Sequence, residues 1–90
     1  MYKIVIVTTE GCEACNIAKY NINAAVAQSS VDIDIILKDF HEFNSKEQKL
    51  YKLRDYPTVL YFANNALVYK SVGTYPIPVY LRWIDIYFKK

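Results

Sequence analysis

The residues of this chain best suited to chemistry are its two cysteines, Cys12 and Cys15, which are spaced C-x-x-C. Two thiols three positions apart can close a disulfide on themselves, or they can supply half of a zinc site. A complete zinc site needs two further ligands, and the chain offers His41 but no second C-x-x-C or H-x-x-x-H pair. The spacing therefore favours redox chemistry, and a zinc site shared between two subunits is the open alternative.

The cysteine pair follows an apolar strand and begins a helix. Residues 3–8 form a β-branched run that is typical of a strand buried on both faces. From about Glu13 to Gln28, apolar residues recur at four-residue intervals, which predicts an amphipathic helix. Cys12 is therefore expected where unpaired backbone N–H groups and the helix dipole stabilise a thiolate. The expected buried positions of the helix are Ala14, Ala18, Ile22 and Val26.

The position of each thiol on the helix predicts its role. Cys12 is expected to be the nucleophile that forms a mixed disulfide with a substrate. Cys15, one turn later, is expected to attack that mixed disulfide and release the reduced substrate. The apolar neighbours Ala14 and Ile17 are expected to cover Cys15 and keep it less reactive.

Two carboxylates oppose the activation of Cys12, because Glu10 and Glu13 flank it. A helix terminus stabilises a thiolate by roughly 0.3–1 kcal/mol. An exposed carboxylate about 7 Å away costs roughly 0.6 kcal/mol at the dielectric constant of water. Since the two effects are similar in size, we expect a moderately activated Cys12 with reducing rather than strongly oxidising behaviour.

The middle of the chain is predicted to hold a strand and a short helix. Period-two alternation predicts a strand over residues 31–37, with Asp32 and Asp34 on its polar side and Val31, Ile33, Ile35 and Leu37 on its apolar side. Asn44 is a suitable N-cap for a helix that ends near Arg54, before the Tyr-Pro pair that disfavours helical backbone. The expected buried contacts of this helix are Leu50 and Leu53.

The C-terminal third is predicted to form a hairpin and a last helix. Residues 58–62 and 67–72 are strand-like runs, and the asparagines at 64–65 tolerate the positive φ of a tight turn between them. Pro76 or Pro78 suits the first turn of a helix, where a missing N–H is harmless. The apolar face of this helix is expected to hold Val79, Trp83, Ile86 and Tyr87.

These elements predict one α/β domain over residues 1–90, with a four-stranded mixed sheet flanked by three helices in the order β-α-β-α-β-β-α. The 53% of hydrophobic residues is ample for a packed core. The net charge is only +2, and the Lys and Arg residues are scattered along the chain and do not form a cluster, so no nucleic-acid partner is expected. No signal-peptide pattern or membrane-length apolar run is present, and we therefore expect a cytoplasmic monomer without a membrane partner.

Three features in order resemble the thioredoxin and glutaredoxin superfamily: the C-x-x-C after the first strand, the Tyr-Pro-Thr before the third, and the Val-Gly that ends the fourth. The resemblance covers the whole chain, whose length is similar to that of glutaredoxins. It implies a thioredoxin fold with a cis proline facing the disulfide. It also implies that a disulfide substrate lies in a groove beside the cysteines. The implied substrate-binding residues are Tyr56, Pro57, Thr58, Gly73 and Thr74.

The chain also departs from the usual motifs of both families. G-C-E-A-C stands in place of the W-C-G-P-C of thioredoxins, and Ile6 occupies the position of their buried aspartate. The glutathione-binding segment of glutaredoxins is missing, and Glu10 and Glu13 repel an anionic tripeptide. We therefore expect no bound cofactor and only weak binding of glutathione.

The sequence leads to the hypothesis of a dithiol oxidoreductase that reduces protein or small-molecule disulfides, with a reductase or glutathione as its electron donor. Two alternatives remain. One is a redox-inert or redox-gated module that binds a partner protein through the same groove. The other is a carrier of a metal or an iron–sulfur cluster that Cys12 bridges between two subunits. His41 is expected to be a solvated loop residue and not a catalytic partner of Cys12.

Overall fold

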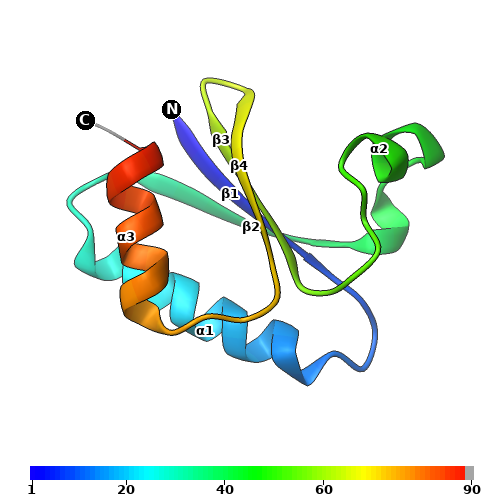
Figure 1. The fold of residues 1–90 in the computed structure, drawn as a ribbon, viewed down its shortest axis with the longest axis horizontal. Coiled ribbons are helices and arrows are strands. Elements are labelled where there is room, and N and C mark those ends of the chain that lie inside the picture. Colours follow the sequence, from blue (N-terminus) through cyan, green and yellow to red (C-terminus); the bar gives the residue numbers. More distant parts are fainter. Residues whose placement is uncertain (89–90) are drawn as a thin grey trace.

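The computed structural model describes residues 1–88, which form four strands and three α-helices (Figure 1). The predicted element order is confirmed, with one additional short 3₁₀ helix, η1. In chain order the elements are β1 (Tyr2–Thr8), α1 (Glu13–Gln28), β2 (Ile33–Asp39), η1 (Phe40–Glu42), α2 (Ser45–Leu50), β3 (Thr58–Ala63), β4 (Ala66–Val72) and α3 (Ile77–Tyr87). Among residues 1–88, every helix is too short or too polar to cross a lipid bilayer.

The sheet is mixed and has the strand order β2-β1-β3-β4. β2 runs parallel to β1, as a crossover through α1 requires, while β3 is antiparallel to both β1 and β4. β1 is paired along both edges and covered on both faces, so its residues Ile4–Val7 are all buried. The prediction of a strand that is buried on both faces is therefore confirmed.

Two apolar clusters cover the two faces of the sheet. On one face, Ile4 and Ile6 of β1 pack with Ile22 of α1 and Ile84 of α3. On the other face, residues of β1 and β3 pack under Phe43 and other side chains of the η1–α2 region. Figure 1 shows α1 and α3 close to each other on one side of the sheet and α2 well apart from both. The predicted arrangement of a sheet flanked by three helices is confirmed.

The buried face of α1 differs from the predicted stripe. The residues that face the core are Cys15, Ala18, Ile22 and Ala25. Ala14 is exposed, and Val26 is only partly buried. A strict four-residue interval drifts by about 40° around the helix at every step, so it cannot follow one face, whereas alternating steps of three and four residues can.

Helix α2 is shorter than predicted, and of its two expected buried residues only Leu53 is buried. It ends at Leu50, which is 69% exposed, and not near Arg54. Lys52 has a φ of +53°, and the N–H of Leu53 donates to the carbonyl of Gln48. This pattern is a Schellman motif with lysine at the left-handed position, and it ends the helix before Leu53, which is buried beyond it.

Two further predicted faces are corrected by the structure. β2 begins at Ile33, so Val31 precedes it, and Leu37 is 46% exposed because β2 is an edge strand of the sheet. On α3, Ile86 is 48% exposed, and the fully buried residues of the helix are Tyr80 and Ile84. The remaining predicted face residues of α3 are only partly buried, namely Val79, Trp83 and Tyr87.

Candidate functional site

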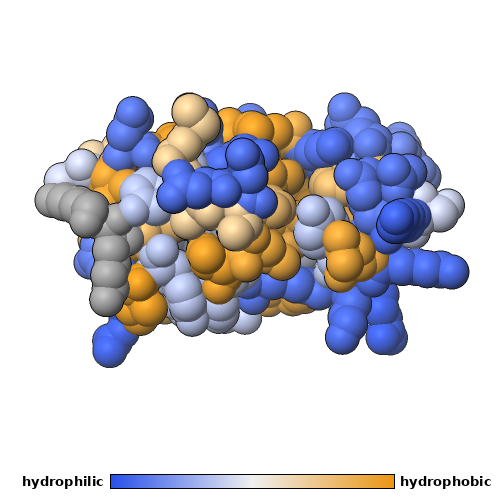
Figure 2. All heavy atoms as spheres, turned by 90° about the horizontal axis from the view of Figure 1, so that it is seen from above, coloured by the Kyte–Doolittle hydropathy of each residue, from blue (hydrophilic) through white to orange (hydrophobic). Residues whose placement is uncertain are grey.

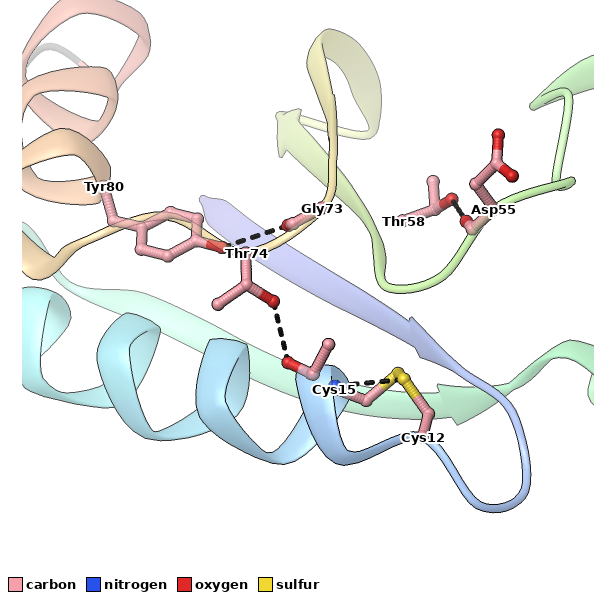
Figure 3. The surroundings of a disulfide bond; sticks show 8 residues. Cys12, Cys15, Asp55, Thr58, Gly73, Thr74 and Tyr80 are labelled. Atoms are coloured by element: carbon pink, nitrogen blue, oxygen red, sulfur yellow. Dashed lines mark hydrogen bonds between the residues drawn. A yellow bond between two sulfur atoms is a disulfide. The ribbon is translucent and has the colours of Figure 1, made fainter.

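Cys12 and Cys15 form a disulfide in this structure, with their Cα atoms 5.3 Å apart (Figure 3). Cys12 is the N-cap of α1, and its Sγ accepts a hydrogen bond from the backbone N–H of Cys15 at 3.0 Å. The sulfur of Cys12 therefore occupies the place of a capping acceptor, where a backbone donor and the helix dipole favour negative charge. This is the position that the sequence predicted.

The two cysteines differ in exposure. Cys15 is 3% exposed, whereas Cys12 is partly exposed. The expectation that Cys15 is the less accessible thiol is confirmed, but the expected cause is wrong, because Ala14 and Ile17 are exposed, the latter to 54%. Cys15 is buried because it lies on the face of α1 that continues through Ala18 onto the sheet.

A cleft of about 460 Å³ opens on one side of the disulfide. The β1–α1 loop forms part of its wall. Gly11 in this loop has a φ of +73°, a left-handed backbone conformation that glycine adopts more easily than other residues. Leu37, near the end of β2, also lines the cleft, although it was predicted on the apolar side of its strand. Glu13 lines the cleft and Glu10 directly precedes Gly11 of its wall; both carboxylates are exposed, so negative charge borders the cleft.

The predicted groove segments lie on another side of the cysteines and are bonded to each other. The Tyr56-Pro57 peptide bond is cis, as the resemblance implied. Pro57 is buried, and its carbonyl accepts a hydrogen bond from the N–H of Gly73 at 2.9 Å. Gly73 has a φ of +95°, so a side chain at this position would strain the backbone. The structure thus brings residues 56–57 and residue 73 together.

The side chain of Thr58 is hydrogen-bonded within the chain. Its side chain is fully buried, and its Oγ1 donates a hydrogen bond to the carbonyl of Asp55 at 2.5 Å (Figure 3). Thr58 therefore stabilises the bend that precedes β3, and its contact with a substrate stays a prediction.

Thr74 connects the groove to the turn between the two cysteines. Its Oγ1 donates a hydrogen bond of 2.8 Å to the backbone carbonyl of Ala14, as Figure 3 shows. The loop after β4 is therefore attached directly to the first turn of α1. The hydroxyl that was assigned to substrate binding is engaged with the chain itself in this structure.

Tyr80 and Asn21 hold the same loop, and sequence reasoning missed both. The hydroxyl of Tyr80 accepts a hydrogen bond from the N–H of Tyr75 at 3.2 Å and donates one to the carbonyl of Gly73 at 3.4 Å. The Nδ2 of Asn21 donates to the carbonyl of Tyr75 at 2.9 Å. Burial raises the pKa of Tyr80, so its hydroxyl stays protonated and able to donate. Its place one turn before Ile84 was the available signal for burial.

Tyr56 precedes the cis proline and is only partly buried. Within residues 1–88, no hydrogen bond involves the Tyr56 backbone, which leaves its N–H and carbonyl available to an extended chain. Its ring lies edge-on against Phe40, with centroids 5.6 Å apart. Burial, with smaller contributions from the charges of Asp39 and Asp55, raises the pKa of the Tyr56 hydroxyl.

Comparison with solved structures identifies the architecture. Thioredoxin-2 of a malaria parasite superposes with a TM-score of 0.78 at 12% identity, over 96% of this chain and 82% of that one. A mutant thioredoxin from Halobacterium salinarum gives a TM-score of 0.79 at 19% identity, over 99% and 76%. The chain has the thioredoxin fold. A further malarial protein gives 0.77 at 11% identity and covers 97% of both chains. No protein-family model matches the sequence, and no curated protein matches it either.

This thioredoxin fold carries an apolar residue at the position where the resemblance placed an aspartate. Ile6 is fully buried in β1, in the same cluster as Ala18 and Ile22 of α1. A carboxylate that could accept a proton from Cys15 is therefore lacking at this position. His41 is exposed in η1, as expected of a solvated residue. In the described part of the chain, no three His, Cys, Asp or Glu side chains gather in a way that could hold a metal ion.

Proposed function

We propose that this chain is a dithiol thiol–disulfide oxidoreductase that reduces disulfides through Cys12 and Cys15. The observation that carries the proposal is the asymmetry of the pair: Cys12 is partly exposed at the N-cap of α1, and Cys15 is buried one turn later. The cis proline loop and the thioredoxin fold support the same function. A substrate sulfur can reach Cys12 but not Cys15.

The proposed reaction moves two electrons from the reduced pair to a substrate disulfide. The Cys12 thiolate attacks one substrate sulfur, which breaks the substrate S–S bond and expels the other sulfur as a thiolate. Cys15 then attacks the Sγ of Cys12, forms the intramolecular disulfide and expels the second substrate thiolate. Both substrate sulfurs leave as thiols after protonation, and the cysteine pair is oxidised. The N–H of Cys15, which points at the Cys12 sulfur, stabilises the attacking thiolate.

Proton removal from Cys15 is the step in which this chain differs from the pattern that the resemblance implies. Ile6 offers no base beneath the resolving thiol. The substrate thiolate expelled in the first step is formed next to the mixed disulfide, and we infer that it takes this proton. The electron donor that regenerates the dithiol is proposed to be a reductase rather than glutathione, because the exposed Glu10 and Glu13 repel an anionic tripeptide.

The proposal is tested by measuring reduction of a protein disulfide with excess dithiothreitol as electron donor. Wild type is expected to accelerate reduction, and Cys12→Ser is expected to lose this acceleration. Lys19→Gln, an exposed change on the same helix, is the matched control and should keep full activity. A wild-type chain that does not exceed the dithiothreitol background, or a Cys12→Ser variant that matches wild type, would contradict the proposal.

A further inference from the structure

A second depression lies beside α2 and combines an apolar floor with a cationic rim. It has a volume of about 510 Å³, and we call it the cationic groove. Its floor includes Phe40 and Leu53, and its rim carries Lys49, Lys52 and Arg54, which are all exposed. In Figure 2, hydrophilic side chains project at the right-hand end of the molecule, which is the end where α2 lies in Figure 1.

The positive charges of the cationic groove lack counter-charges within the described part of the chain. No acidic side chain lines the groove, and no ion pair to its three rim cations occurs among residues 1–88. The nearby Glu47 and Glu42 accept hydrogen bonds from the backbone N–H groups of Asn44 and Asp39, respectively, in two helix caps. Like charges that gather without partners repel one another and create a local positive potential, which an anionic ligand relieves.

A fourth cationic side chain is held beside the groove. The Nζ of Lys70 on β4 donates a hydrogen bond to the carbonyl of Lys52 at 3.3 Å. That carbonyl belongs to the Schellman motif that ends α2, and the side-chain amide of Gln48 fixes the motif further by donating to the carbonyl of Phe43 at 2.9 Å. The charges are therefore carried by an ordered backbone and not by a loose tail.

The cationic groove continues toward the disulfide face. Phe40, on its floor, contacts the ring of Tyr56, which precedes the cis proline. Arg54, on its rim, is followed by Asp55, and Figure 3 shows Asp55 beside Thr58 in the surroundings of the disulfide. A polypeptide that passes along Tyr56 can therefore extend into the cationic groove.

We propose that the cationic groove binds an acidic segment of the protein substrate, with carboxylates at Lys49, Lys52 and Arg54 and an apolar side chain over Phe40 and Leu53. This inference rests on the proposed oxidoreductase function and names its substrate class. A peptide fits better than a nucleic acid because the floor is apolar. A peptide can also place acidic residues over the cationic groove and neutral residues near Glu10 and Glu13, whereas every unit of a phosphate backbone is charged.

The test measures binding separately from redox chemistry. A fluorescent acidic peptide that contains one leucine and no cysteine is titrated with wild type, with Lys49→Gln/Arg54→Gln and with Lys19→Gln/Arg82→Gln, at low and at high salt. Both double variants remove two positive charges from exposed positions, so net charge and folding are matched. The groove variant is expected to bind about three- to tenfold more weakly than wild type, as the loss of two exposed ion pairs predicts, and the control variant should bind as wild type does.

A second arm separates this proposal from the proposed function. A neutral disulfide-bonded peptide is reduced by wild type and by both variants at equal rates if the redox function holds. If that peptide is not reduced, but the Lys49→Gln/Arg54→Gln variant still binds the acidic peptide more weakly than wild type, then the proposed redox function is wrong and the proposed binding of an acidic segment is supported. Equal weakening by both double variants, no weakening by either, or tighter binding of a single-stranded oligonucleotide than of the peptide would overturn the proposal.

Discussion

Replacing Thr74 with valine removes the hydroxyl that joins the loop after β4 to the turn between the cysteines. The Oγ1 of Thr74 lies 2.8 Å from the carbonyl of Ala14. Valine keeps the β-branched shape of threonine and therefore leaves the backbone preference of the position unchanged. The variant thus isolates one hydrogen bond.

The size of the effect follows from the environment of that bond. An intramolecular hydrogen bond contributes roughly 0.5–1.5 kcal/mol net. Because this one is solvent-exposed, water can replace the lost donor, and we expect a loss of about 0.5–1 kcal/mol in the free energy of unfolding. For a domain of this size, such a loss lowers Tm by about 2–8 °C. The loop keeps its bonds to Pro57, Asn21 and Tyr80, so it should remain folded.

Urea denaturation followed by circular dichroism measures the stability of wild type, Thr74→Val and Thr74→Ser. Serine retains a hydroxyl, so it should recover most of the loss. In the disulfide-reduction assay, Thr74→Val should raise KM more than it lowers kcat, because it loosens the wall of the groove and not the cysteine pair. A valine variant as stable as wild type, or a serine variant as unstable as valine, would refute the reasoning.

The remaining predictions concern stability. The hydroxyls of Tyr61 and Ser71 share a buried hydrogen bond of 3.1 Å. Tyr61→Phe or Ser71→Ala alone should lower the free energy of unfolding by roughly 1–3 kcal/mol, because each leaves one buried hydroxyl unpaired. The double variant should lose less than the sum of the two single losses. Additive losses in urea denaturation of the four proteins would contradict this coupling. Burial raises the pKa of Tyr61, so the folded chain keeps a proton that the unfolded chain releases above about pH 10, and stability should fall as the pH rises beyond that value. Tyr61→Phe should lose less stability than wild type over the same rise in pH, and an equal loss in both proteins would show that Tyr61 is not its cause. Gly73→Ala should cost about 1–2 kcal/mol through backbone strain alone, because the nearest atom to an added Cβ, Cε2 of Tyr75, is 4.0 Å away; a loss below about 0.5 kcal/mol on thermal melting would show that the loop adapts.

The sequence was most informative where chemistry depends on local spacing. Cys12 and Cys15 form the predicted pair at a helix N-terminus because a C-x-x-C turn and a helix cap are both short-range features. The cis bond before Pro57 was implied by the resemblance and not by any local pattern. These residues account for the part of the site that could be anticipated.

The sequence was least informative where side chains meet across the fold. The bond from Thr74 to Ala14 joins residues sixty positions apart, and no periodicity reports such a contact. The hydrogen bonds of the Tyr80 hydroxyl to Tyr75 and Gly73 could not be predicted for the same reason. An aromatic residue on a helix face indicates burial, but it does not identify the partner of its hydroxyl. Leu37 was assigned to the apolar side of its strand, but it is exposed, because alternation shows which face a residue occupies and not whether its strand lies at the edge of the sheet.

Trapping the mixed disulfide distinguishes the attacking thiol, which we propose is Cys12, from the resolving thiol, which we propose is Cys15. Reduced Cys15→Ser and Cys12→Ser variants are each mixed with a disulfide-bonded peptide, quenched in acid and analysed by intact-mass spectrometry. We expect a stable one-peptide adduct on Cys12 in the Cys15→Ser variant and little adduct on the buried Cys15 in the Cys12→Ser variant. An adduct that forms equally fast on Cys15, or the lack of an adduct on Cys12, would show that the roles of the two thiols are not as proposed.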